Sequence, residues 1–319
     1  MLSPTVLAAS LVTSLAAGTC TLPSGDLTRP ETWGDYFLDK YAAERAAATD
    51  HIEAGPAPIA QPRTVLLITG VTIPAEWFDP IVLRLQRDGF RPVVWEPPAL
   101  LSGDLFENSR RLAQVIDEIR AQTGEERIDI LAECTGGLLA RHYIQSLGGN
   151  EHVSRMITFI SPQHGLPKAA FAHDVVGWPA LEDLTPGSAF LDAVNNAPLP
   201  PEVAVTSIYT CTDEYIQPYK TSIIPGAKNI GLCDEFVGHF QFFYDPEIYL
   251  VMHDELVRPA PTDPVGQPAD PTAPDPTTDD EAGVHESGGC AAAGGSGGPA
   301  SALVLGAVAL GAVRRRRRR

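Results

Sequence analysis

One cysteine stands in a pattern that suits a nucleophile. Cys134 lies in "LAECTGG", residues 131–137, between a strand-like run and a helix-like run. A nucleophile on a strand-to-helix turn needs little bulk around it, and Gly136 and Gly137 meet that need. Such a short pattern also arises by chance, and Cys134 would then be a small buried hydrophobic residue. The register with the surrounding strand-like segments favours the nucleophile.

An acid and a base follow in the chain order expected for nucleophilic catalysis. Asp213 comes directly after the strand-like "SIYTCT", and His239 follows "NIGLCDEFVG". A triad on strand ends runs nucleophile, acid, base, which predicts Cys134, Asp213 and His239. The alternatives are a solvated turn at Asp213 and an ordinary loop histidine at His239.

Two backbone N–H groups are candidates for an oxyanion hole. The residue after the nucleophile, Thr135, supplies one. The other is expected from Val71, in the loop after the first core strand, where Gly70 allows the backbone to approach a substrate closely.

Buried strand-like runs alternate with amphipathic ones along the middle of the chain. The predicted strands cover 64–69, 91–96, 127–133, 155–161, 203–210 and 227–232. Helix-like runs that end in glycine lie between them, at "DPIVLRLQRDG" and "LFENSRRLAQVIDEIRAQTG". This alternation predicts an α/β fold with a mostly parallel sheet and helices on both faces.

A further helix is predicted ahead of the first strand, over residues 31–48. Trp33, Phe37 and Tyr41 fall on one side of it. Such a stripe indicates core packing more often than a substrate lid.

Both ends of the chain differ from the middle. Residues 1–19 are apolar and small and resemble a secretory signal, although no Lys or Arg precedes the apolar stretch. The predicted organisation is a signal peptide (1–19), a helical extension (20–61), a catalytic-size domain (62–257), a Pro/Asp/Thr-rich linker (258–289) and a C-terminal tag (290–319).

The tag combines Cys290, small residues, a short apolar run and the arginine block 314–319. It resembles a MYXO-CTERM-type sorting tag, which implies display at the cell surface and attachment to the cell envelope, with processing near Cys290. An ordinary tail anchor is the alternative, and both place the domain outside the cytoplasm.

Export from the cytoplasm would allow two of the other cysteines to form a disulfide. An oxidising compartment favours a disulfide between Cys211 and Cys233, because they end two consecutive predicted strands. Cys134 is then expected to stay free, and the alternative is two unpaired buried cysteines.

Charge and motifs exclude some functions. The net charge is −17, and without the six terminal arginines it is 17 − 40 = −23. A protein with this negative charge repels the phosphate backbone, which disfavours nucleic-acid binding. The chain has no C-x-x-C, H-E-x-x-H or G-x-G-x-x-G pattern, so no cofactor and no metal is predicted. The expected oligomeric state is a monomer.

Several ordered motifs over residues 62–257 resemble α/β-hydrolase lipases and esterases of the bacterial triacylglycerol-lipase type. "LAECTGGLLARHYIQSLGG" is similar to their "AHSMGGLLARYYI", and "ITFISPQHG" to their "TLGTPHHG". "TSIYTCTDEYIQP" and "VGHFQFFYDPEIY" resemble the segments that carry the triad acid and base, here Asp213 and His239. The resemblance implies an α/β-hydrolase fold, an ester or lipid substrate and a structural role for His164.

The chain departs from that family at the nucleophile. Cys134 replaces serine, Glu133 replaces the preceding histidine, and Thr69 replaces the histidine after the first strand. A thiolate attacks acyl groups well, whereas an acidic neighbour disfavours a thiolate. The leading hypothesis is therefore a Cys-His-Asp carboxylic ester hydrolase with an acyl-thioester intermediate. An acyltransferase and an inactive lipid- or polymer-binding protein are the alternatives.

Overall fold

The computed structural model describes residues 22–263 of the chain. Six strands form one sheet in the order β2-β1-β3-β4-β5-β6, and all five pairings are parallel. The strands are β1 (Thr64–Ile68), β2 (Arg91–Trp95), β3 (Ile128–Glu133), β4 (Val153–Phe159), β5 (Ala204–Thr210) and β6 (Lys228–Leu232). Each begins and ends within two residues of its predicted bounds, and the predicted parallel sheet is confirmed.

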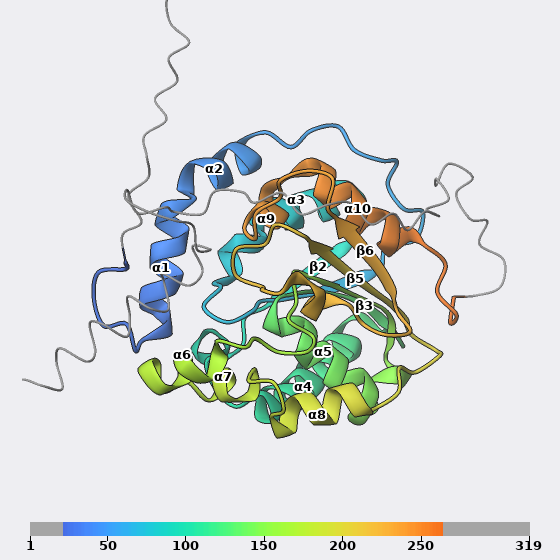
Figure 1. Ribbon diagram of the computed structural model, residues 1–319. Helices are drawn as coiled ribbons and strands as arrows, with labels where there is room; N and C mark the ends of the chain where they lie inside the picture. Colours follow the sequence, from blue (N-terminus) through green and yellow to red (C-terminus); the bar gives the residue numbers. More distant parts are fainter. Residues whose placement is uncertain (1–21, 264–319) are drawn as a thin grey trace, which may run out of the picture.

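Helices cover both faces of the sheet (Figure 1). They are α1 (Pro30–Lys40), α2 (Ala42–Asp50), α3 (Asp79–Arg87), α4 (Leu105–Thr123), α5 (Thr135–Ser146), α6 (Ala169–Val176), α7 (Pro179–Asp183), α8 (Ala189–Asn196), α9 (Gln241–Tyr244) and α10 (Pro246–Val257). Short 3₁₀ turns are η1 (Ala75–Phe78), η2 (Pro98–Leu101), η3 (Gly149–Glu151) and η4 (Tyr219–Ser222). The sequence left the segment 165–200 undefined, and it contains α6, α7 and α8.

Two hydrophobic cores lie on opposite faces of the sheet. One packs α4, α5 and α8 against it, and the other packs α1, α3, α9 and α10. Every residue of β1 and β3 is buried, whereas the edge strands β2 and β6 are partly exposed. Burial on both faces explains why the central strands have near-continuous apolar sequences instead of alternating ones.

The N-terminal helix packs beside the loop that follows β6. A break at Tyr41 divides the predicted helix into α1 and α2. Trp33 and Phe37 are buried, as core packing predicts, and the Phe37 ring lies 4.8 Å from that of Phe240. The extension 20–61 therefore contributes aromatic contacts next to His239, the candidate base.

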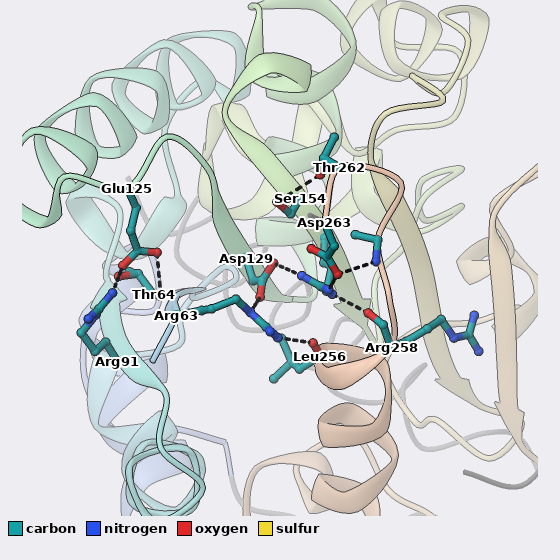
Figure 2. Close-up of polar contacts among 12 residues, drawn as sticks. Arg63, Thr64, Arg91, Glu125, Asp129, Ser154, Leu256, Arg258, Thr262 and Asp263 are labelled. Carbon is teal, nitrogen blue, oxygen red and sulfur yellow. Dashed lines mark hydrogen bonds and ion pairs between the residues drawn. The ribbon is translucent and has the colours of Figure 1, made fainter. Parts of the chain in front are cut away.

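A buried ionic network lies at the amino ends of β3 and β4 (Figure 2). Asp129 pairs with Arg155 and with Arg63, each at 3.1 Å, and Arg155 also pairs with Asp263. Arg155 Nε donates to the carbonyl of Arg258 at 2.8 Å. Residues 258–263, assigned to the linker by sequence, thus lie against the domain, and the folded part continues to Asp263.

Within residues 22–263, no helix has the length and apolarity needed to cross a membrane. The predicted signal peptide and sorting tag lie outside the described residues.

Candidate active site

Cys134 occupies a strained turn between β3 and α5. Its φ is 47° and its ψ is −124°, a conformation that residues other than glycine rarely adopt. A Cβ on Gly137 would lie 2.0 Å from Thr158 Oγ1, and one on Gly136 would lie 2.9 Å from the Ile68 carbonyl oxygen. Both glycines are therefore required by close packing of the turn against the sheet, as the sequence pattern predicts.

Polar groups on β4 and the loop after it hold this turn in place. The Cys134 N–H donates to the Phe159 carbonyl at 3.0 Å, and Ser161 Oγ donates to the Cys134 carbonyl. Gln163 Nε2 in turn donates to Ser161 Oγ at 2.7 Å. Sequence reasoning missed these supports, because the segment "SPQHG" drew attention to His164 alone. His164 Nε2 instead contacts the Ile223 carbonyl at 2.9 Å and takes no part in the site.

Asp213 and His239 form a buried pair. His239 Nδ1 lies 2.9 Å from Asp213 Oδ2. The other carboxylate oxygen, Oδ1, accepts the N–H groups of Tyr215 and Ile216, each at 2.7 Å. These two hydrogen bonds fix the carboxylate so that Oδ2 faces the imidazole. His239 Nε2 is then left to face Cys134.

Glu133 is a second carboxylate beside His239, which sequence reasoning did not place there. It is fully buried, and its Oε2 accepts the Gly70 N–H at 2.6 Å. Its Oε1 accepts no hydrogen bond and lies 3.4 Å from His239 Nε2. The carboxylate oxygen, the Cys134 sulfur and the His239 nitrogen all lie within 4.8 Å of one another. The imidazole is thus placed between two carboxylates.

The surroundings shift the pKa of each member of the cluster. Burial raises the pKa of Glu133, whereas the neighbouring His239 acts in the opposite direction and lowers it. Burial and the Glu133 carboxylate raise the pKa of the Cys134 thiol, although the residue keeps some solvent exposure. For His239, burial alone would lower the pKa, but Asp213, Cys134 and Glu133 together raise it well above its usual 6.5. The resting thiol is therefore disfavoured as a thiolate, while the imidazole is a strong proton acceptor.

The two N–H groups predicted for an oxyanion hole flank the cysteine. Thr135 is the first residue of α5, where backbone N–H groups have no partner within the helix. Val71 lies in the loop after β1, next to Gly70, where a Cβ would lie 2.8 Å from Cys134 Cβ. Neither N–H donates a hydrogen bond to another group of the described chain. Both donors are free for a ligand.

Cys211 and Cys233 form the predicted disulfide, with a Cα–Cα distance of 4.9 Å. Each directly follows a strand, β5 or β6, and begins the loop that carries Asp213 or His239. Within the described residues, Cys134 is the free cysteine. The bond ties together the two loops that carry Asp213 and His239.

Comparison with known proteins supports a lipase-like domain. No family model matches the chain. The chain is 27% identical to lipase B of Pseudozyma antarctica over 171 residues, which are 52% of this chain and 49% of the relative. The chain thus spans about half the length of the curated relative it matches.

Solved structures establish the fold. The chain is similar to lipase B of Aspergillus fumigatus, with a TM-score of 0.54, 20% identity and coverage of 67% of this chain and 57% of that one. It is also similar to lipase BlEst2 of Bacillus licheniformis in propeptide form, with a TM-score of 0.52, 17% identity and coverage of 67% and 54%. The predicted α/β-hydrolase fold is confirmed.

Proposed function

We propose that the chain is a carboxylic ester hydrolase whose nucleophile is Cys134. The observation that carries the proposal is the strained cysteine at the strand-to-helix turn, with the His239–Asp213 pair beside it. A positive φ at a residue other than glycine is retained where the surrounding structure enforces it, and such strain is concentrated at functional sites. The likeness to lipases in sequence and in fold supports an ester or lipid substrate.

The first half of the reaction is acylation. His239 Nε2 takes the thiol proton while the Cys134 sulfur attacks the ester carbonyl carbon, and a C–S bond forms. The Val71 and Thr135 N–H groups stabilise the oxyanion of the tetrahedral intermediate. The intermediate collapses to an acyl thioester, and the proton on Nε2 passes to the departing alcohol oxygen.

The second half is deacylation. Nε2 takes a proton from water, and the hydroxyl oxygen attacks the thioester carbonyl. The C–S bond then breaks to release the acid, and the proton on Nε2 passes to the departing sulfur to restore the thiol. Asp213 keeps the imidazole oriented and stabilises the imidazolium in both halves. Glu133 adds a second negative charge beside that imidazolium, which favours proton transfer to Nε2 but disfavours charge on sulfur.

A second candidate is a binding protein that retains the fold without turnover. The raised pKa of the Cys134 thiol favours this alternative, because a neutral thiol is a poor nucleophile. Acyl transfer to an alcohol is a third outcome, in which the alcohol replaces water in deacylation.

Turnover of p-nitrophenyl esters over a series of acyl chain lengths tests the proposal. We expect hydrolysis by the wild-type protein and none by Cys134→Ala. Iodoacetamide should abolish activity and label Cys134, and substrate should protect the thiol. Equal rates for the two proteins, or full activity after stoichiometric alkylation, would refute a catalytic Cys134. Ester products formed on addition of alcohol would indicate acyl transfer.

We also propose that the domain is exported and displayed on the cell surface through its C-terminal tag. The sequence of residues 290–319 supports this proposal. Mass spectrometry of the surface-localised protein should find a C-terminus near Cys290. An intact Arg319 on that protein would contradict tag processing.

A further inference from the structure

We propose that Glu133, Cys134 and His239 form a binding site for a borderline-soft divalent metal ion such as Zn²⁺. A carboxylate, a thiolate and an imidazole are the three kinds of side chain that bind this ion. Glu133 and Cys134 are adjacent, His239 lies more than a hundred positions further along the chain, and the three ligand atoms lie within 4.8 Å of one another. No sequence motif for metal binding marks such a site, which is why the sequence predicts none.

The distances fit tetrahedral coordination after a small adjustment. Zinc bonds to nitrogen and oxygen place those two ligand atoms about 3.4 Å apart in a tetrahedron, and a sulfur ligand about 3.6 Å from each. Glu133 Oε1 and His239 Nε2 are already 3.4 Å apart. The sulfur is within 4.8 Å of both, so a modest movement of one side chain brings all three to the ion.

Each ligand is already held by a second hydrogen bond of the kind that metal sites use. Metal-bound histidines usually donate their other N–H to a carboxylate, and His239 Nδ1 lies 2.9 Å from Asp213 Oδ2. Glu133 Oε2 accepts the Gly70 N–H at 2.6 Å, which leaves Oε1 as a single coordinating oxygen. Thr135 Oγ1 lies 3.7 Å from the Cys134 sulfur. The donor atoms are oriented before any ion arrives.

The second oxygen of Glu133 is the independent sign of a ligand. Glu133 Oε1 belongs to a fully buried side chain, accepts no hydrogen bond from the described residues, and has only the long ion-pair contact of 3.4 Å with His239 Nε2. A buried carboxylate oxygen without a donor is unfavourable. A cation among these three atoms would satisfy it, and the two charges of Glu133 and a Cys134 thiolate would balance the charge of the ion. Partial exposure of Cys134 leaves a route by which the ion can reach the three ligands.

Two of the three departures from the serine-hydrolase pattern, Cys134 and Glu133, contribute to this site. Serine at position 134 would offer a weakly coordinating hydroxyl, and histidine at position 133 would offer a neutral imidazole without the negative charge that balances the ion. Cysteine and glutamate at the same positions supply a thiolate and a carboxylate beside His239. Metal binding therefore gives a physical reason for the two substitutions to occur together.

Metal occupancy would also regulate the reaction, a consequence that rests on the proposed function. An ion on the sulfur and on Nε2 removes the nucleophile and the proton acceptor at once. We therefore expect the protein to be an ester hydrolase only when free of the metal, with inhibition reversed by a chelator.

Cobalt(II) absorption tests the site without relying on activity. The full-length protein would carry Cys20→Ser and Cys290→Ser, so that Cys134 is its single free thiol. Addition of Co²⁺ should give a thiolate-to-metal charge-transfer band, and Zn²⁺ should displace it. Cys134→Ser should abolish the band. Its absence from the parent protein would overturn the proposal.

Two further variants separate this site from adventitious surface binding. Glu133→Gln keeps an acceptor for the Gly70 N–H but loses the charged ligand, and we expect zinc affinity to fall about tenfold or more. The control is Asp35→Asn with Glu96→Gln, in an open acidic cleft of about 410 Å³ whose lining includes none of the three ligands. That control should leave affinity and the charge-transfer band unchanged. Equal affinity for Glu133→Gln and the parent would refute the carboxylate ligand.

Esterase assays with EDTA and with Zn²⁺ distinguish the two proposals. Turnover in EDTA that Zn²⁺ abolishes supports both. A charge-transfer band without turnover in EDTA supports the metal site and overturns the ester hydrolase. Turnover in EDTA without any charge-transfer band supports the ester hydrolase and overturns the metal site. Turnover that rises with Zn²⁺ overturns the inhibitory role of the metal.

Discussion

Two buried acidic residues of the same strand have very different partners. Asp129 and Glu133 lie near opposite ends of β3, and both are almost fully inaccessible to solvent. Each oxygen of Asp129 pairs with an arginine, Arg155 or Arg63 (Figure 2). Glu133 has one backbone N–H on Oε2, while Oε1 accepts no hydrogen bond.

This difference separates charge that maintains the fold from charge that is available to a reaction. A buried ion destabilises the protein unless it is paired and hydrogen-bonded, and the amino end of the sheet meets that condition. The carboxyl end leaves Glu133 Oε1 without a hydrogen bond, and the Val71 and Thr135 N–H groups have no acceptor among the described residues. Substitutions at the two ends should therefore affect different properties.

The largest effect is expected from Asp213→Asn, on activity. The new side-chain oxygen still accepts the Tyr215 and Ile216 N–H groups, so its amide group faces His239. The imidazole then carries its proton on Nε2 and cannot accept one from Cys134. We expect kcat/KM for a p-nitrophenyl ester to fall about 10⁴-fold. Urea unfolding should be nearly unchanged, and a large loss of stability would contradict the division between the two ends.

The reverse is expected for Asp129→Asn. Removal of this charge leaves Arg155 buried without its partner, and Arg63 loses the same carboxylate. We expect the free energy of unfolding to fall by about 3–5 kcal/mol, measured by urea denaturation. Asp117→Asn is the matched control, because Asp117 is exposed in its pair with Arg120 and should contribute less than about 1 kcal/mol. Esterase activity per folded molecule should stay at the wild-type value, and its loss would show that the amino end also serves catalysis.

The disulfide between Cys211 and Cys233 should stabilise the fold at the carboxyl end of the sheet, where Cys134 and His239 lie. It closes a loop over a sequence separation of 22 residues. Cys211→Ala with Cys233→Ala should lower the free energy of unfolding by about 3 kcal/mol. Cys134→Ala should leave that free energy nearly unchanged. A double variant as stable as the wild type would show that the loops of Asp213 and His239 are held by other contacts.

Much of the scaffold is predictable from the sequence for a clear reason. Central parallel strands are buried on both faces, so "TVLLI" and "IDILAE" appear as continuous apolar runs. Strand ends also place Cys134, Asp213 and His239 in order, because parallel strands bring their carboxyl ends to one edge. The same reasoning predicted the disulfide.

The remaining features depend on contacts between distant parts of the chain. The sequence predicted that Glu133 disfavours a thiolate, and the raised pKa of Cys134 agrees with this. No local pattern reveals that the two oxygens of Glu133 face Gly70 and His239. Arg155 and Asp263 pair across 108 positions of sequence. The helices of 165–200 are short, so their periodicity is too brief to predict.

The smallest expected effect is a shift in pH dependence for Glu133→Gln, measured in EDTA so that no metal contributes. The Glu133 carboxylate raises the pKa of both Cys134 and His239, and its loss should lower both values. Neutral imidazole and reactive thiolate would then form at lower pH. We therefore expect the acid limb of kcat/KM and the rate of iodoacetamide labelling at Cys134 to move to lower pH. Glu118→Gln on the exposed face of α4 is the matched control and should move neither. If both profiles stay in place, Oε1 does not act on the imidazole, and the contrast between Asp129 and Glu133 concerns stability alone.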